Sequence, residues 1–249
     1  MIVRAIKTRK VTSRACTLEE LLNESISELS EGSVVAIASK VVSLCEGQVV
    51  PVEGTDKEAL IAEQAQLFMP SPSNPYGVSL TVTRNLLVAA AGIDESNADN
   101  EYVLWPADAQ ASANRARAFL REKFGLKQVG VIITDSATRP FEWGTTGISI
   151  AYSGFEPLKD YIGQDDLFGR KLVYQKNNIQ GGLAAAAATA MGEGSEQKPL
   201  AVLSDLDFVT FVDADPTAEE LAALKIEPEA DIYAPLLNHA PWHKGQGKA

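Results

Sequence analysis

VGVIITDS, residues 129–136, joins the most apolar strand-like run of the chain to an aspartate and a serine. Valine, isoleucine and threonine in so short a run are typical of a β-strand. The pattern predicts a strand over 129–134, with Asp135 and Ser136 directly after its end. The fold is therefore expected to contain a sheet with polar groups at the end of one of its most apolar strands.

The remaining patterns surround this strand with both helices and strands. Helical spacing of apolar residues, caps and glycine stops predict helices over 17–30, 57–68, 109–124 and 182–191. β-branched runs predict strands over 33–39, 200–203 and 208–212, and a hairpin over 79–91 that turns at Arg84-Asn85. Because hairpins and helices mix without regular βαβ alternation, we expect an α+β fold with mixed or antiparallel sheets and packed helices.

The domain expectation follows from the same pass along the chain. Residues 1–230 are predicted to form one folded unit, with two intertwined subdomains as the alternative. Residues 231–249 contain Pro235, Pro241 and Gly245 and are predicted to form an irregular tail.

Composition excludes several classes of function. The chain has 249 residues, 45% of them hydrophobic, so an ample core is expected. A net charge of −11 with only 22 Lys and Arg residues argues against a nucleic-acid surface, so we expect no nucleic-acid partner. No apolar run reaches the length of a membrane span and no cleavable leader is visible, so we expect a cytoplasmic protein without a membrane partner. Cys16 and Cys45 lack metal-site spacing and are expected to be buried thiols rather than a disulfide framework.

Two polar clusters follow predicted strands. Asp94 and Asn97 lie in GIDESN, residues 92–97, where a carboxylate could hold a cation and the amide could meet a phosphate or ribose. An ordinary turn, stabilised by side-chain bonds to its own backbone, is the favoured alternative there. Asp135 and Ser136 resemble the carboxylate and hydroxyl that hold metal against phosphate oxygens, and Arg139 adds a charge for an anion. A capping turn explains that cluster equally well.

Three further clusters are weaker when each is taken alone. Ser39 and Lys40 end the strand predicted over 33–39, where the lysine could bind phosphate or simply lie on the surface. Glu193 lies between Gly192 and Gly194, which permit close backbone approach to a phosphate but also suit an ordinary helix end. The acidic loop over 163–170 is better explained as a solvated turn with a surface salt bridge.

Taken in order, these segments resemble the coenzyme F420:L-glutamate ligase (γ-glutamyl ligase) family over nearly the whole chain. The blocks are SKVVS at 39–43, GIDESN at 92–97, VGVIITDS at 129–136, DLFGR at 166–170 and LAAAA with MGEG across 183–194. KTRKV at 7–11, SNPYGVSLT at 73–81, VLWP at 103–106 and IAYSGFEPL at 150–158 are most similar to a bacterial branch assigned to folate metabolism.

The resemblance implies an intertwined homodimer that binds GTP, or ATP, with Mg²⁺ or Mn²⁺. It assigns the metal to four oxygen donors: Asp94, Asp135, Ser136 and Glu193. It assigns the nucleotide to six residues: Ser39, Lys40, Asn97, Gly192, Gly194 and Ser195. Asp135 and Arg139 are the catalytic candidates.

The implied chemistry is ligation through an acyl phosphate. An acceptor carboxylate takes the γ-phosphoryl group, and the amine of L-glutamate then displaces phosphate. Three departures from the family pattern bear on this reading: Lys7 to Lys10 replace a Gly/Pro-containing loop, Gly181-Gly182 replace an aspartate, and Glu142 replaces a basic residue. Glu142 disfavours an acceptor with an extra phosphate, so we expect a folate-like acceptor, with the deazaflavin F420 precursor as the alternative. A nucleotide-binding regulatory protein without catalysis is the alternative of another class.

Overall fold

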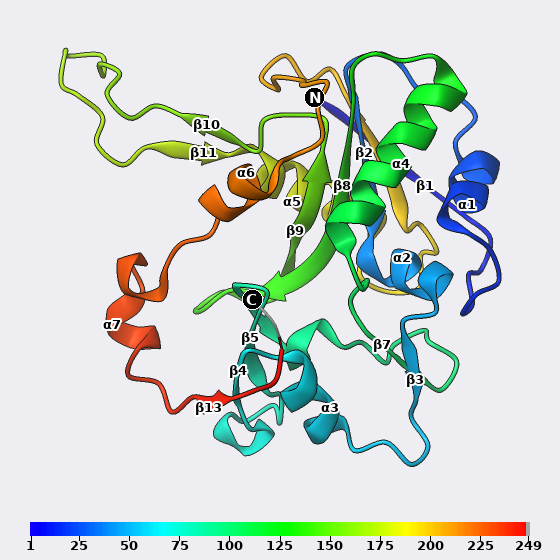
Figure 1. Ribbon diagram of the computed structural model, residues 1–249, viewed down its shortest axis with the longest axis vertical. Coiled ribbons are helices and arrows are strands. Elements are labelled where there is room, and N and C mark those ends of the chain that lie inside the picture. The colour runs from blue at the N-terminus through cyan, green and yellow to red at the C-terminus, as the bar shows by residue number, and fades with distance from the viewer. Residues whose placement is uncertain (248–249) are drawn as a thin grey trace. The chain divides into compact units, whose positions relative to one another are not determined.

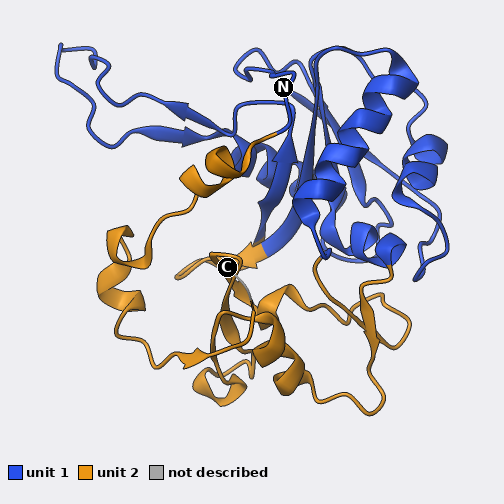
Figure 2. Cartoon of the chain, in the orientation of Figure 1, with its two compact units in different colours: residues 1–46, 106–136, 146–215 blue, residues 47–105, 137–145, 216–249 orange. Residues whose placement is uncertain are grey.

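The computed structural model describes residues 1–247, which divide into two compact units interleaved along the chain (Figure 2). The first unit comprises Met1–Glu46, Pro106–Ser136 and Thr146–Asp215. The second comprises Gly47–Trp105, Ala137–Thr145 and the described residues from Pro216 onward. None of the helices within residues 1–247 combines the length and the apolar character that crossing a membrane requires.

The first unit is built on a five-stranded mixed sheet. Its order is β1 (Ile2–Ile6), β12 (Leu200–Ser204), β2 (Ser33–Ala38), β8 (Val129–Thr138) and β9 (Thr145–Ser153). β2 runs parallel to β8, whereas β12 is antiparallel to both β1 and β2. The centres of β2 and β8 are buried on both faces, which explains why their sequences are apolar without alternation.

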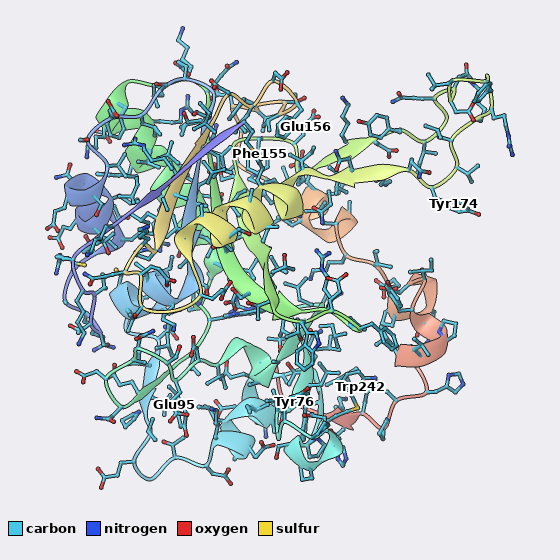
Figure 3. All side chains as sticks on the ribbon, turned by 180° about the vertical axis from the view of Figure 1, so that it is seen from behind. Tyr76, Glu95, Phe155, Glu156, Tyr174 and Trp242 are labelled. Atoms are coloured by element: carbon cyan, nitrogen blue, oxygen red, sulfur yellow. The ribbon has the colours of Figure 1, made fainter. Side chains whose placement is uncertain are left out.

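Helices cover both faces of this sheet (Figures 1 and 3). α1 (Leu18–Ser25), α2 (Ser39–Glu46) and α4 (Ala109–Phe124) share one apolar cluster with Val35, Ile37 and Val131 of the sheet. α5 (Ile179–Met191) lies on the opposite face from α4, where Gly147 of β9 permits close contact. A Cβ at Gly147 would stand 2.4 Å from the carbonyl oxygen of Ala184. The core of this unit therefore lies in two layers, one on each side of the sheet.

A hairpin arm projects from the first unit (Figure 1). Its base is the antiparallel pair β10 (Leu158–Asp160) and β11 (Lys176–Asn178). Figure 3 shows Tyr174 on this arm, away from Phe155 and Glu156 near its base.

The second unit has a small antiparallel sheet of its own. Its order is β13 (His243–Lys244), β4 (Leu67–Met69), β5 (Leu80–Thr83) and β6 (Leu86–Ala89). β3 (Val49–Pro51) pairs with β7 (Glu101–Val103), and α3 (Lys57–Gln64) contributes Leu60 and Ile61 to the core. Short 3₁₀ turns lie at Ser71–Ser73 and Ala90–Gly92. Residues 216–242 carry α6 (Ala218–Ala223), a 3₁₀ turn at Pro228–Ala230 and α7 (Ala234–Leu237).

The α+β class with mixed and antiparallel sheets is confirmed, as are several individual elements. α4 spans the predicted residues and ends at Gly125, whose φ of 65° is the left-handed cap that glycine favours. The predicted hairpin turns at Arg84 and Asn85, with φ values of 50° and 63°.

Other predicted boundaries were wrong, two because a distant strand pairs with the segment and one because of a local helix cap. β8 continues to Thr138 alongside β9, so Asp135 and Ser136 lie within the strand rather than after it. α5 begins at Ile179 because the side chain of Asn178 caps it, which places Gly181 and Gly182 inside the helix. Residues 67 and 68, predicted as the end of a helix, belong to β4 and pair with β5 instead.

Three further expectations also differ. α1 ends at Ser25, because Ile26 is already extended. Residues 208–212 form no strand and make only the single bridge between Phe211 and Phe155. The segment expected to be an irregular tail contains α7 and β13, and β13 pairs with β4 through His243 and Phe68.

Candidate functional site

The first unit brings the polar ends of its two parallel strands together. Ala38 of β2 is the register partner of Thr134 of β8. Because the strands are parallel, Ser39-Lys40 and Asp135-Ser136 follow this pair at the same edge of the sheet. Ser39 is buried and Lys40 is half-buried, as the first two residues of α2. Ser39-Lys40 and Asp135-Ser136, which are far apart in the sequence, are therefore neighbours in the fold.

Glu193 joins this edge from the loop after α5. The Ser136 hydroxyl donates to Glu193, with Oγ lying 2.8 Å from Oε1 and 3.0 Å from Oε2. Asp135 Oδ1 accepts the backbone N–H of Ser136 at 2.9 Å. One hydroxyl and two carboxylates thus gather at the continuation of the most apolar strand.

The loop after α5, residues 192–195, is called the glycine loop. Its backbone is held by Glu196, a residue that the sequence reasoning missed. Gly192 has a φ of 87° and ends α5, and its N–H donates to the Ala188 carbonyl. Glu196 Oε2 accepts the backbone N–H of Gly194 at 2.8 Å. A backbone N–H that binds a carboxylate oxygen has the geometry to bind another anion. The position of Glu196 directly after Gly194-Ser195 was the signal in the sequence from which this contact could have been predicted.

A second missed contact ties the N-terminal basic stretch to the same loop. Thr8 donates its N–H to the Gln197 carbonyl at 3.1 Å, and Gln197 Nε2 donates to the Thr8 carbonyl at 2.8 Å. Thr8 is buried, although its neighbours Lys7 and Arg9 are exposed. The segment that departs from the family pattern therefore lies beside the end of the glycine loop.

The second unit carries the other predicted residues. Asp94 exchanges two backbone hydrogen bonds with Val103, and its Oδ1 accepts the Ser96 N–H at 2.7 Å. This is the side-chain turn expected as the alternative, and it leaves Asp94 half-buried. Asn97 is exposed with a φ of 54°. Arg139 and Glu142 are exposed in the turn between β8 and β9.

The donor set of the first unit suits a hard cation. Over residues 1–247 the structure assembles no group of three or more His, Cys, Asp or Glu side chains able to hold a metal. Mg²⁺ needs no such group, because it binds through one or two carboxylates and completes its shell with water and substrate phosphates. Asp135, Glu193 and the Ser136 hydroxyl offer only hard oxygen atoms, which also suit Mn²⁺. The residues of this edge therefore fit a divalent metal.

The acidic loop of the arm is a self-contained turn. Lys171 Nζ lies 2.7 Å from Asp165 Oδ1, and Asp166 accepts the N–H groups of Phe168 and Arg170. The expected surface salt bridge is present, with Lys171 as the basic partner.

Known proteins match this chain over most of its length. A family model described as F420-0:Gamma-glutamyl ligase matches residues 6–205. The coenzyme F420:L-glutamate ligase of Methanopyrus kandleri is 36% identical over 205 residues, covering 76% of this chain and 81% of that protein. The protein of the same name from Methanothermobacter thermautotrophicus is 31% identical over 202 residues, covering 73% and 78%. That of Methanococcus maripaludis is 34% identical over 232 residues, covering 87% and 90%.

Proposed function

This chain belongs to the F420-0:gamma-glutamyl ligase family, and on that premise we propose that it joins L-glutamate to the F420 precursor. The predicted enzyme class, a ligase that forms a carbon–nitrogen bond with glutamate, is confirmed by this membership. The observation that carries the proposal is the gathering of Ser136, Glu193 and Asp135 beside Ser39-Lys40 at one sheet edge.

The relatives change the expected acceptor of glutamate. These relatives are named coenzyme F420:L-glutamate ligases, which favours the alternative over the folate-like acceptor suggested by Glu142. A single exposed carboxylate in a turn is weaker support than a family match over residues 6–205. The experiment below therefore includes a folate-like acceptor for comparison.

We assign nucleotide binding to groups suited to phosphate. Lys40 provides a point charge, and the backbone of Gly192, Gly194 and Ser195 provides N–H donors. Ser39 completes the assignment in the first unit, and Asn97 stays a contact that only the resemblance implies. A bound divalent metal would neutralise charge on the phosphate oxygens, with Asp135, Ser136 and Glu193 of the first unit as its assigned ligands. Asp94 stays a ligand that only the resemblance implies.

The proposed reaction has two balanced steps. An oxygen of the acceptor carboxylate bonds to the γ-phosphorus, and the bond from that phosphorus to the nucleoside diphosphate breaks, which gives an acyl phosphate. The glutamate amine then bonds to the acyl carbon, phosphate leaves, and the nitrogen loses a proton. Positive side chains lower the cost of the charge that gathers on phosphate, and in the first unit we assign this role to Lys40. Arg139 stays a catalytic candidate from the sequence.

The test measures product and phosphate together. The purified chain is incubated with GTP or ATP, Mg²⁺ or Mn²⁺, L-glutamate, and either the F420 precursor or tetrahydrofolate, and mass spectrometry identifies any glutamyl product. Asp135→Asn is compared with Asp205→Asn, an exposed aspartate just after β12. We expect glutamylated F420 precursor from the wild type and from Asp205→Asn, and none from Asp135→Asn. Glutamylated folate alone would reject the proposed acceptor, and nucleotide binding without any product would favour the regulatory alternative.

The homodimer implied by the resemblance stays a prediction, and we propose the arm as its contact with a second copy. Leu167 and Phe168, near the tip, are 99% and 90% exposed. Exposed apolar side chains of this size mark interaction surfaces. Light scattering of the wild type, a Leu167→Ser/Phe168→Ser double variant and a Lys171→Ser control tests this contact. A dimer that survives the double variant unchanged would exclude the arm.

A further inference from the structure

Two thiols that are far apart in sequence meet in the first unit. Cys16 Sγ lies 3.9 Å from Cys45 Sγ, although the residues are 29 positions apart. Cys16 lies just before α1, and Cys45 lies in the last turn of α2. Both thiols are free, Cys16 is buried and Cys45 is partly exposed. An oxidant can therefore reach the pair from the side of Cys45.

We propose that Cys16 and Cys45 are a reversible redox pair that closes to a disulfide in the presence of a disulfide oxidant such as glutathione disulfide. In the first step the Cys45 thiolate bonds to one glutathione sulfur, and reduced glutathione leaves. The Cys16 thiolate then attacks Cys45 Sγ and displaces the second glutathione. Two protons and two electrons pass from the protein to the oxidant, so the exchange is balanced.

The backbone already holds the two segments in place for this bond. A disulfide requires a sulfur–sulfur distance of about 2.05 Å, so the thiols must approach by about 2 Å. The Arg14 N–H donates to the Leu44 carbonyl at 2.8 Å, one residue before Cys45. Cys16 also packs with Leu21 of α1 and Val41 of α2 in one apolar cluster. Side-chain rotation and a small shift of the segment before Cys16 are therefore enough.

The electrostatic surroundings set the rate and the direction of the exchange. Burial, followed by the nearby Cys16 thiol, raises the pKa of Cys45 to about 12, while Arg9 acts in the opposite direction and Glu19 in the same. Little thiolate is present at neutral pH, so closure is slow there and speeds up as the pH rises. The same lack of thiolate stabilisation favours the disulfide once it has formed, because a stabilised thiolate is what makes a disulfide strongly oxidising.

Closure would join the two segments that frame the sheet edge. α2 begins at Ser39 and Lys40, and the stretch before Cys16 is bound to Gln197 through Thr8. The disulfide would fix this stretch to α2. An effect on nucleotide binding rests on the proposed function, whereas bond formation does not.

The experiment detects the bond itself in the full chain. The reduced protein is incubated with glutathione disulfide at neutral and at alkaline pH, quenched with acid and alkylated. Mass spectrometry then measures the intact mass of the chain. We expect a loss of two hydrogen atoms, no alkylation, faster closure at alkaline pH, and reversal by dithiothreitol. Tryptic peptides 15–40 and 41–57 each contain one of the cysteines, and we expect them to be cross-linked.

Three outcomes would overturn the proposal. Both cysteines could still be alkylated after treatment with glutathione disulfide, the protein could keep a stable adduct with one glutathione, or a non-reducing gel could show a disulfide between two chains. Urea unfolding supplies a second measurement. The oxidised wild type should unfold at higher urea concentration than the reduced wild type, because the cross-link restricts the unfolded chain. Cys45→Ala should show no difference between the two conditions. The labelling of the wild type remains decisive if that variant does not fold.

Discussion

Ser136 donates its hydroxyl to both carboxylate oxygens of Glu193, which fixes the loop after α5 against the strand β8. The two residues are 57 positions apart in the sequence. Because a hydroxyl on a carboxylate limits how the carboxylate can turn, this contact orients Glu193 at the Ser136 position of β8. The proposed metal site depends on that orientation.

Removal of the Ser136 hydroxyl should weaken metal use without loss of the fold. For Ser136→Ala we expect the Mg²⁺ concentration that gives half-maximal ligation to rise by about 10- to 100-fold, as when a group that orients a metal ligand is lost. Stability should change by less than about 0.5 kcal/mol, because the contact is exposed. Ser136→Thr keeps the hydroxyl and is the matched control. A Mg²⁺ dependence equal to that of the wild type in Ser136→Ala would remove Ser136 from the site.

Arg117 should be among the most important polar residues for stability. It is 3% exposed and donates to the carbonyls of Val129, Val212 and Asp213, besides its ion pair with Asp215 at 3.1 Å. Arg117→Met leaves the buried Val129 carbonyl oxygen, and the carbonyls of Val212 and Asp213, without these donors. We therefore expect a loss of about 3 kcal/mol in the free energy of unfolding. Denaturant unfolding measures this loss.

Arg121, one turn further along α4, is the matched comparison. It pairs with Asp213 at 2.7 Å but is far more exposed than Arg117. Arg121→Met should therefore cost less than about 1 kcal/mol. Equal losses for the two variants would show that burial does not set the contribution of these arginines.

The parts of the fold that were predicted correctly are those with local signals. α4 has helical spacing and a glycine stop, and the hairpin has two residues that tolerate positive φ, so neighbouring residues are enough to define them. Residues 208–212 have strand-like composition, but composition supplies no partner strand, and Phe211 makes only one bridge. Residues 67–69 became a strand because β5 was available to pair with them.

The sequence identified the residues of the candidate site but not how they are arranged in space. The motifs identified Ser39-Lys40, Asp135-Ser136 and Glu193 separately. Their meeting depends on the parallel register of β2 with β8 and on the packing of α5, neither of which leaves a local signal. The same reasoning explains why the contact between Cys16 and Cys45 was not foreseen.

The two glycines inside α5 should respond differently to alanine. A Cβ at Gly182 meets nothing within 4 Å, so Gly182→Ala should stabilise the protein by about 0.5–1 kcal/mol through helix propensity. A Cβ at Gly181 would lie 2.6 Å from the side-chain nitrogen of Asn178, which caps the helix. Gly181→Ala should therefore gain less or destabilise, because the cap must move. Thermal unfolding of the pair measures the difference, and an equal gain would show that the cap adjusts freely.

Glu31 should make stability depend on pH in the acidic range. Its carboxylate accepts the backbone N–H groups of Lys127 at 2.8 Å and Gln128 at 2.6 Å, and these bonds lower the pKa of Glu31 below its ordinary value of 4.5. The unfolded chain thus binds a proton at a higher pH than the folded chain does. The stabilisation is complete above the ordinary value and is lost as the pH falls through the lowered pKa of the folded state.

Glu31→Gln should therefore be less stable than the wild type at neutral pH, and the difference should shrink as the pH falls below 4.5. Urea unfolding at a series of pH values measures the gap between the two proteins, which cancels the titration of the other groups. Glu28→Gln is the control, because Glu28 makes only a 3.6 Å ion pair with Arg4 at the surface, and such pairs contribute little. A gap for Glu31→Gln that stays constant, or widens toward low pH, would contradict the assignment of the lowered pKa to these two backbone bonds.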